Sequence, residues 1–206
     1  MPDLTTLALF CAATLALLVV PGPAVVYIVT RSVAQGRAAG LVSVAGIHAG
    51  SIVHVVAAAL GISALLAASA TAFTIVKVLG VAYLVYLGVR AIIKRDTADL
   101  VELKVHSKKR LFWEGFVVNV LNPKTAIFFL AFLPQFVDTT HPVAPQIALL
   151  GAVWIVLGLA SDGAFALLAS ALAGKLRGSA RARRRLNVGS GLIYLGLGAY
   201  LATSKS

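Results

Sequence analysis

The sequence predicts an all-α integral membrane protein in which six transmembrane helices form two inverted three-helix repeats. Hydrophobic residues make up 60% of the 206 residues and charged residues only 12%, about half the ~25% typical of a soluble domain. Prolines interrupt two of the expected helices, in Pro21-Gly22-Pro23 and in Asn122-Pro123-Lys124. The whole chain, 1–206, is therefore expected to be one polytopic membrane domain. Four long runs lack Asp, Glu, Lys and Arg altogether: residues 4–30, 38–76, 139–161 and 186–204.

The first three helices are expected at about 4–31, 40–66 and 71–93. A bilayer core requires ~20 apolar residues per helix, and none of these ranges contains an acidic residue. The first range is predicted to be a retained helix, because its apolar run exceeds the roughly 7–15 residues of a signal sequence. It also lacks a basic start, since Asp3 is the only charge before Arg31.

The last three helices are expected at about 112–136, 146–173 and 187–203. The first of these contains the second proline break. The second contains Asp162, which is the only acid deep within an apolar run. The polar segment 95–111 separates them from the preceding helices, so the two repeats are expected at about 1–94 and 112–206.

Basic residues occur in alternate connections, which predicts the orientation of the chain. Cytoplasmic loops carry the excess of Lys and Arg. The odd-numbered connections are therefore expected in the cytoplasm and both termini outside. The basic cluster 175–185 is interpreted first as a topology determinant, with an anionic-lipid site as the alternative. The basic connections contain Arg31 and Arg37, most charges of 94–111, and 175–185, whereas those around 67–70 and 137–145 contain no Lys or Arg.

The two halves of the chain share short patterns that indicate an internal repeat. Residues 80–84 (GVAYL) match residues 191–195 (GLIYL), and Pro23 matches Pro123. Each half contains three expected helices, and an odd number of spans reverses direction, so the second half must be inverted. Inverted repeats with interrupted helices are typical of transporters that bind their substrate near the membrane midplane. A chance match among frequent Gly, Leu and Tyr residues is the alternative.

The proline breaks free backbone groups that suit a zwitterion. Proline lacks an N–H and clashes with the carbonyl four residues before it, so the breaks are expected to free the carbonyls of Leu17, Val19 and Asn119. Such carbonyls can accept from an ammonium, and the helix that begins after each break offers N–H groups to a carboxylate. Structural kinks satisfied by neighbouring side chains are the alternative. The predicted substrate site comprises Pro21, Gly22, Pro23, Asn119, Asn122, Pro123 and Lys124.

Asp162 is the residue expected to carry a proton. An acid within a membrane span indicates a proton or ion path, with a structural hydrogen bond or ion pair as the alternative. Asp162 shares a helical stripe with Gly158, whose small size favours close helix packing. Lys124 is expected to counter Asp162, to bind a carboxylate, or to snorkel to the cytoplasmic interface. Asn119 and Asn122 share a helix face that either lines the path or bridges helices.

His48 and His54 on the second helix are further candidates for proton coupling, because histidine titrates near neutral pH. His54 shares a stripe with Gly46 and Gly50 and is therefore expected to face protein. There it would assist Asp162 or simply pack. Six positions separate the two imidazoles, which puts them on different helix faces and argues against a joint metal site.

Several function classes are not expected. The net charge of +11 would suggest nucleic acid in a soluble protein, but Lys and Arg cluster here in polar connections without interleaved aromatic residues. Catalytic motifs such as His-Glu-x-x-His and metal-ligand spacings are absent from the sequence, so no enzyme activity and no metal or other cofactor is expected. The single cysteine, Cys11, excludes an intramolecular disulfide.

Three motifs resemble those of the LysE/RhtB family of amino acid exporters. The resemblance extends over nearly the whole chain and includes the polar third connection. It implies a multi-pass protein of the bacterial inner membrane that exports amino acids or their derivatives by proton antiport. Members differ in substrate, and the motifs do not fix it. The motifs are Pro21-Gly22-Pro23, Asn122-Pro123-Lys124 and the set Gly80, Tyr83, Leu84 and Gly88.

Taken together, the sequence predicts a proton-coupled exporter that alternates access between two inverted halves. Asp162, His54 and His48 are its predicted proton-coupling residues. The expected partners are a small amino acid, protons and the lipid bilayer, and a second copy of the chain is a candidate partner in a homodimer. An exporter of metal or other inorganic ions of related architecture is the alternative. It would require acidic or histidine ligands at membrane depth, and this sequence contains few.

Overall fold

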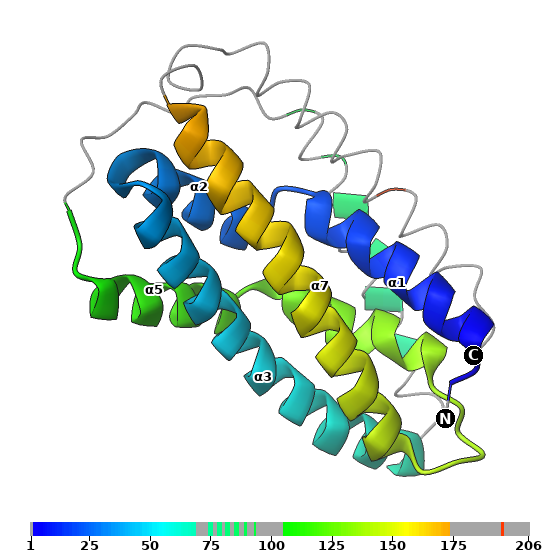
Figure 1. The fold of residues 1–206 in the computed structure, drawn as a ribbon. Helices are drawn as coiled ribbons and strands as arrows, with labels where there is room; N and C mark the ends of the chain where they lie inside the picture. The colour runs from blue at the N-terminus through cyan, green and yellow to red at the C-terminus, as the bar shows by residue number, and fades with distance from the viewer. Residues whose placement is uncertain are drawn as a thin grey trace.

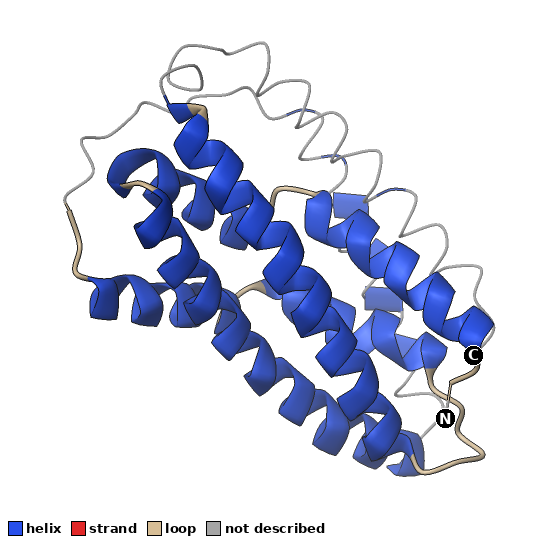
Figure 2. Cartoon of the chain, in the orientation of Figure 1, coloured by secondary structure: helices blue, strands red, loops and turns tan. Residues whose placement is uncertain are grey.

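The computed structural model describes residues 2–68 and 105–173, together with residue 195 and scattered positions between 74 and 93. Every element within these residues is helical, and no strand occurs among them (Figure 2). Of the predicted helix 71–93 only the scattered positions are described, and all of them are helical. The predicted helix 187–203, the basic cluster 175–185 and the matching run 191–195 lie outside the described residues, apart from residue 195. The six-helix inverted repeat therefore stays a prediction.

The first predicted helix is two helices joined by a bend. α1 (Leu4–Val19) begins at Asp3, whose carboxylate accepts from the Thr6 amide at 2.7 Å. α2 (Pro23–Gln35) begins at Pro23, a favoured first helical residue because its missing N–H has no helical partner there. The two axes differ by 54°. α2 ends at Gly36, whose φ of 82° is open to glycine at little cost.

The fourth predicted helix is also broken, and more extensively than the sequence suggested. α5 (Lys108–Val120) is followed by α6 (Pro123–Ile127), the π-helix η1 (Phe128–Phe132) and the 3₁₀ helix η2 (Leu133–Phe136). The bend between α5 and the segment that begins at Pro123 is 47°. Pro134 explains the second irregularity, because it cannot bond the carbonyl of Leu130 and would clash with it in a regular α-helix. The prediction of a single break in 112–136 was therefore incomplete.

Two unbroken helices form the centre of the bundle. α3 (Arg37–Ala68) and α7 (Val143–Ala171) each contain a stretch long and apolar enough to cross a membrane, and each bent pair can supply a further span. α3 packs mainly against α5 and α7 (Figure 1). Two apolar clusters lie along α7. The first is aromatic and brings Phe10 of α1 and Phe128 of η1 to Trp154, and the second surrounds Ala166.

A polar turn connects η2 to α7. Asp138 accepts from the amide and hydroxyl of Thr140 at 2.9 and 2.6 Å, and the His141 ring lies 2.6 Å away. The Thr140 hydroxyl contributes most to lowering the pKa of Asp138 to about 2, and the Thr140 amide and His141 add to it. The stabilisation is therefore complete above the ordinary aspartate pKa and is lost as pH falls toward 2. Asp138 is charged throughout the physiological range.

Close packing of α3 on α5 depends on glycine, and this gives a testable prediction for stability. A Cβ at Gly46 would overlap the backbone carbonyl of Phe112, and backbone cannot rotate away. We expect Gly46→Ala to lower the free energy of unfolding by about 1–3 kcal/mol. Gly61→Ala on the same helix is the matched control, because no atom of the described part of the chain lies within 4 Å of its added Cβ. Thermal unfolding in detergent measures both variants, and equal midpoints would contradict the prediction.

Candidate functional site

The two helix breaks meet at one small cavity. Its volume is about 20 Å³, which is enough for about one water molecule. It borders both apolar clusters, because the lining residues Leu18 and Trp154 belong to the aromatic cluster and Ile47 belongs to the cluster around Ala166. The structure thus brings together most of the predicted site. The lining residues are Leu18, Gly22, Ala24, Val25, Ile47, His48, Ser51, Asn119, Asn122, Lys124, Thr125, Trp154 and Asp162.

Lys124 closes the first break from the opposite half of the chain. Its Nζ donates to the carbonyls of Leu17 at 2.8 Å and Val20 at 2.7 Å. The sequence predicted freed carbonyls at Leu17 and Val19; Lys124 bonds that of Leu17 and, in addition to the prediction, that of Val20. The Lys124 side chain is buried, with 8% of the residue exposed. The alternative in which this lysine snorkels to the membrane interface was therefore wrong.

Asn119 and His54 close the second break. The Asn119 carbonyl, which Pro123 deprives of its α-helical donor, accepts from the His54 Nε2 and from the Asn122 amide, each at 2.9 Å. The Asn119 amide donates to the carbonyl of Ile47 and to the Ser51 hydroxyl on α3, at 2.8 and 2.9 Å. Its side-chain oxygen accepts from the Thr125 hydroxyl at 3.0 Å. Asn119 thus both lines the cavity and bridges helices, the two alternatives that the sequence left open.

Asn122 shapes the second break. Its side-chain oxygen accepts from the Lys124 amide at 3.1 Å and caps the start of α6. This cap occupies a backbone donor that an incoming carboxylate would otherwise use. At the first break the corresponding position is Gly22, which has no side chain to cap α2. The two breaks therefore differ, because α6 begins with a side-chain cap and α2 does not.

Asp162 is paired with His48, not with His54. The Asp162 Oδ2 lies 3.0 Å from the His48 Nε2, and the two residues are 2% and 4% exposed. The other atoms of the pair, Asp162 Oδ1 and His48 Nδ1, are buried without a hydrogen-bond partner among the described residues. The hypothesis that His54 assists Asp162 does not match this geometry, because the His54 Nε2 is engaged by the Asn119 carbonyl.

Gly158 allows the His48–Asp162 pair to form. A Cβ at this position would overlap the His48 ring, so the imidazole lies directly against the backbone of α7. Gly158 and Asp162 are one turn apart and therefore face the same way. The glycine stripe that the sequence indicated is thus the surface on which His48 packs.

The three prolines shape the site without lining the cavity. Pro23 and Pro123 are exposed and Pro21 is half-buried, and the residues around the cavity do not include them. Their contribution is to end one helix and fix the start of the next. Of the predicted substrate residues, Gly22, Asn119, Asn122 and Lys124 line the cavity and the three prolines do not. Substrate binding by these residues stays a prediction.

Sequence reasoning missed two polar residues of the cavity. Ser51 and Thr125 lie at its wall and both bond the Asn119 side chain. Thr125 directly follows Lys124, and Ser51 lies between the two histidines of α3. Ser51 and Thr125 could have been identified from the sequence, because each is a polar residue within an apolar run and lies near a residue that had been singled out. Within the described parts of the chain, no three His, Cys, Asp or Glu side chains are grouped so that they could hold a metal ion.

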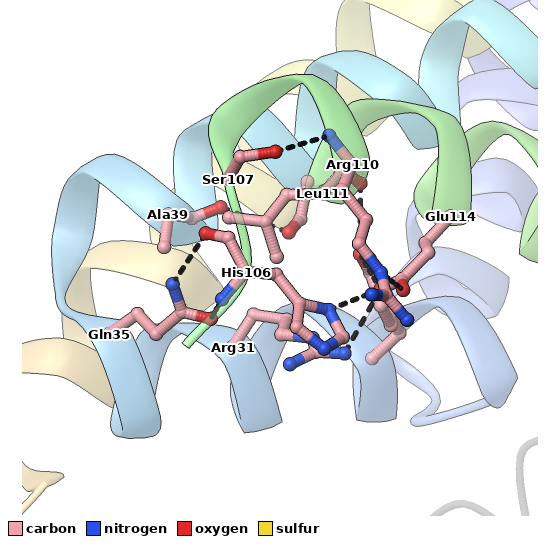
Figure 3. A network of polar contacts seen from close by, with 10 residues as sticks. Arg31, Gln35, Ala39, His106, Ser107, Arg110, Leu111 and Glu114 are labelled. Atoms are coloured by element: carbon pink, nitrogen blue, oxygen red, sulfur yellow. Dashed lines mark hydrogen bonds and ion pairs between the residues drawn. The ribbon is translucent and has the colours of Figure 1, made fainter. Parts of the chain in front are cut away.

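A second polar cluster joins the end of α2 to the start of α5 (Figure 3). Glu114 is its centre and accepts from Arg31 at 2.9 Å and Arg110 at 2.8 Å, with the His106 Nδ1 3.0 Å away. Gln35 holds the backbone of His106 through two hydrogen bonds of 2.9 and 3.0 Å. The sequence contained the signal, since Glu114 is an acid within the predicted helix 112–136, but it was not singled out. We call Arg31, His106, Arg110 and Glu114 the Glu114 cluster.

Comparison with known proteins gives the family. The model of the family described as LysE type translocator matches residues 15–205. A homoserine/homoserine lactone efflux protein of Salmonella typhimurium is 32% identical over 186 residues, covering 90% of each chain. An uncharacterised membrane protein of Vibrio cholerae is 33% identical over 189 residues, covering 90% of this chain and 91% of its own.

More distant relatives extend the same group. A leucine efflux protein of Salmonella choleraesuis is 26% identical over 193 residues, covering 92% of this chain and 91% of its own. No solved structure matches the chain. The family match covers nearly the full length, and the resemblance that the proline motifs indicated is confirmed. The chain belongs to the LysE type translocator family of membrane proteins.

Proposed function

We propose that this protein exports amino acids or close derivatives across the bacterial inner membrane in exchange for protons. The relatives named as homoserine and leucine efflux proteins support the substrate class. The observation that carries the proposal is the buried carboxylate of Asp162, whose Oδ1 has no partner among the described residues and which lines the cavity between the two breaks. Buried charged atoms are normally paired, so this oxygen is the natural partner for a substrate ammonium.

The first turn of α2 is the proposed partner of the substrate carboxylate. Gly22, Ala24 and Val25 line the cavity, and α2 begins without a side-chain cap. The amide groups of a first helical turn lack helical partners and form the positive end of the helix dipole. Asp162 on one wall and the start of α2 on another match the two charged ends of an amino acid.

Competition at Asp162 would couple the substrate to the proton. A carboxylate can hold a proton or form an ion pair with an ammonium, and the two states exclude each other. The His48 Nε2, 3.0 Å from Oδ2, can deliver the proton or receive it. In the proposed cycle a proton entering from outside displaces the substrate ammonium, and a new substrate on the cytoplasmic side releases the proton. The exchange is antiport in which the proton itself is the coupling ion.

Alternating access is the proposed route to and from the cavity. Its volume of about 20 Å³ is far below the roughly 300–1,000 Å³ of a ligand pocket, so an amino acid enters only if the helices move apart. The aromatic cluster around Phe128 and Trp154 would close the predicted outer side. The Glu114 cluster would close the predicted cytoplasmic side, where α2 meets α5.

Uptake into inside-out membrane vesicles tests the proposed function, because cellular export appears there as uptake. The vesicles are energised to an acidic interior and supplied with a panel of labelled amino acids, with and without a protonophore. We expect saturable uptake of one amino acid class that the protonophore abolishes. Absence of uptake across the panel, with folded protein verified, would contradict amino acid export. Uptake that ignores the protonophore would contradict proton antiport alone.

The proposed role of the Glu114 cluster predicts that Glu114→Gln opens the cytoplasmic side more often. The substitution removes the charge that holds Arg31 and Arg110, and each ion pair of this kind contributes ~0.2–1 kcal/mol. A bias of about 1 kcal/mol corresponds to about a fivefold change in the population of the open state. We therefore expect a thiol introduced in the cavity to react about fivefold faster.

The single native cysteine makes this measurement simple. A Ser51→Cys thiol in a Cys11→Ala background reports on the cavity, and a small charged thiol reagent is applied from the cytoplasmic face. Asp138→Asn is the matched acid-to-amide control, since it lies in the turn before α7 outside both clusters. An unchanged rate in Glu114→Gln, or an equal increase in Asp138→Asn, would contradict the gate.

A further inference from the structure

Two carbonyl oxygens at the end of α1 accept hydrogen bonds from one buried lysine ammonium. The Lys124 Nζ is 2.8 Å from the Leu17 oxygen and 2.7 Å from the Val20 oxygen. These two oxygens belong to the last turn of α1 and to the residue that follows it. The lysine belongs to α6, more than a hundred positions away along the chain. The contact therefore connects the two halves of the molecule at its two helix breaks.

The physical character of this place is that of a cation site. The last carbonyls of a helix lack the amide four residues ahead and form the negative end of its dipole. The Leu17 carbonyl also accepts from the Val20 amide at 3.2 Å, so the Lys124 ammonium is its second donor. In transporters with broken helices, unwound carbonyls and helix C-terminal ends coordinate the coupling cation. Here both oxygens are in segments that are buried, since Leu17 and Val20 are 1% and 0% exposed. The buried Lys124 ammonium supplies both a positive charge and hydrogen-bond donors to these two carbonyl oxygens.

We propose that the Leu17 and Val20 carbonyls form a monovalent-cation site, and that Lys124 fills it as a cation tethered to the other half. This deepens the proposed function, on which it rests for its place in transport. The substrate ammonium is then left to Asp162 and does not use the carbonyls of the first break. The site also needs no sodium ion, because the chain supplies its own cation.

The tether has a consequence for the cycle. The carbonyls lie on α1 and the ammonium on α6, so separating the two halves on either side must stretch or break these two hydrogen bonds. Asp162 lines the same cavity as Lys124, so its carboxylate can receive the displaced ammonium. When the first helix break opens, Lys124 thereby moves its positive charge to Asp162, the carboxylate proposed to bind the substrate ammonium.

Chemical rescue of Lys124→Ala tests the cation site without any transport assay. Thermal unfolding of the purified variant in detergent is followed as methylammonium is added. Tetramethylammonium at the same salt concentration is the control, because this ion has the same charge as methylammonium but no N–H to donate. We expect saturating methylammonium to raise the midpoint of Lys124→Ala by about 2–4 °C, through binding to the folded state only. Wild-type protein should not respond, since its own lysine occupies the site.

Lys124→Met separates the cation from simple packing, because it keeps most of the apolar stem and lacks the charge. We expect it to be less stable than wild type and to respond weakly to methylammonium, since its side chain fills the space. Stability equal to wild type in Lys124→Met, or equal effects of the two ammonium ions on Lys124→Ala, would overturn the proposal. If Lys124→Ala yields folded protein only when methylammonium is present during purification, the cation site is supported; no recovery in either salt counts against it.

The sodium dependence of wild-type transport gives an independent check. Uptake into the vesicles should be the same when sodium is replaced by potassium, and a strict sodium requirement would overturn the tethered cation. If wild type transports no amino acid at all, the proposed function fails while the unfolding experiments still decide the cation site. The two failures are thus distinguishable.

Discussion

Asp162→Asn is expected to abolish pH-driven export while leaving the protein folded and inserted in the membrane. Asparagine has the shape of aspartate and can still accept a hydrogen bond from the His48 Nε2, so packing against α7 is retained. It can neither take up a proton nor hold an ammonium by charge. Truncating one partner of a buried charge pair costs ~2–5 kcal/mol, which corresponds to a loss of transport of about 30-fold to 4,000-fold.

The measurement is uptake into inside-out vesicles at a series of imposed pH gradients, normalised to the amount of folded protein. Asp138→Asn is the matched control, because it is also an aspartate-to-asparagine change but lies in an exposed turn whose carboxylate bonds only Thr140 and His141. We expect uptake by this control to equal that of wild type. Protonophore-sensitive uptake by Asp162→Asn at wild-type rates would remove Asp162 from the coupling mechanism.

His48→Gln separates the two members of the pair. A glutamine retains a donor for Asp162 but does not exchange protons. If the imidazole delivers the proton, transport slows while exchange of labelled for unlabelled substrate continues, because the substrate still pairs with Asp162. Loss of both processes would mean that His48 chiefly positions the carboxylate. In either case the comparison assigns a role to the residue that the structure places 3.0 Å from Asp162.

The helix breaks were predictable because they follow from covalent chemistry. A proline lacks its N–H wherever it lies, so Pro21, Pro23 and Pro123 ended helices in the structure as the sequence predicted. Pro134 shows the limit of that reasoning. It does not end the segment but shifts it into π and 3₁₀ geometry, because the aromatic residues around it pack well enough to hold an irregular helix together.

The partners of the polar residues were harder to predict, because they depend on how helices rotate against one another. His48 and His54 are both on α3, and the sequence favoured His54 for Asp162 on the basis of its glycine stripe. That stripe faces α5, where Gly46 and Gly50 approach its backbone. His48 faces α7 and Gly158 instead. Only the three-helix packing decides which histidine meets the acid.

The sequence did not predict where the Lys124 side chain points, for a related reason. A lysine stem is long enough to reach the membrane interface or the interior from the same backbone position. The sequence could not choose, because the deciding partners are backbone carbonyls and leave no mark in the residue pattern. In the structure the side chain points toward the end of α1, where its Nζ donates to the Leu17 and Val20 oxygens.

Asn119→Ala is expected to be the most destabilising single change among the cavity residues. Its side chain makes three hydrogen bonds, to Ile47, Ser51 and Thr125, and the residue is 2% exposed. Interhelical hydrogen bonds in membranes average ~0.6 kcal/mol each, and leaving buried polar groups unpaired costs ~1–3 kcal/mol more. We expect a loss of about 2–4 kcal/mol in the free energy of unfolding.

Thermal unfolding in detergent should show this as a midpoint about 5–15 °C lower than that of wild type. Ser170→Ala is the control, since this exposed hydroxyl bonds only the Leu167 carbonyl of its own helix, and a surface change of this kind stays within about 0.5 kcal/mol. Asn119→Asp keeps the acceptor for Thr125 but removes the two donated bonds, so its midpoint should lie well below wild type too. If the unfolding midpoint of Asn119→Ala equalled those of Ser170→Ala and wild type, the Asn119 hydrogen bonds between α3 and the second break would not be what stabilises the site. The rigidity that keeps Lys124 and Asp162 at one cavity would then have to come from the other contacts, namely the close glycine packing of α3, the Lys124 bonds to α1 and the His48–Asp162 bond.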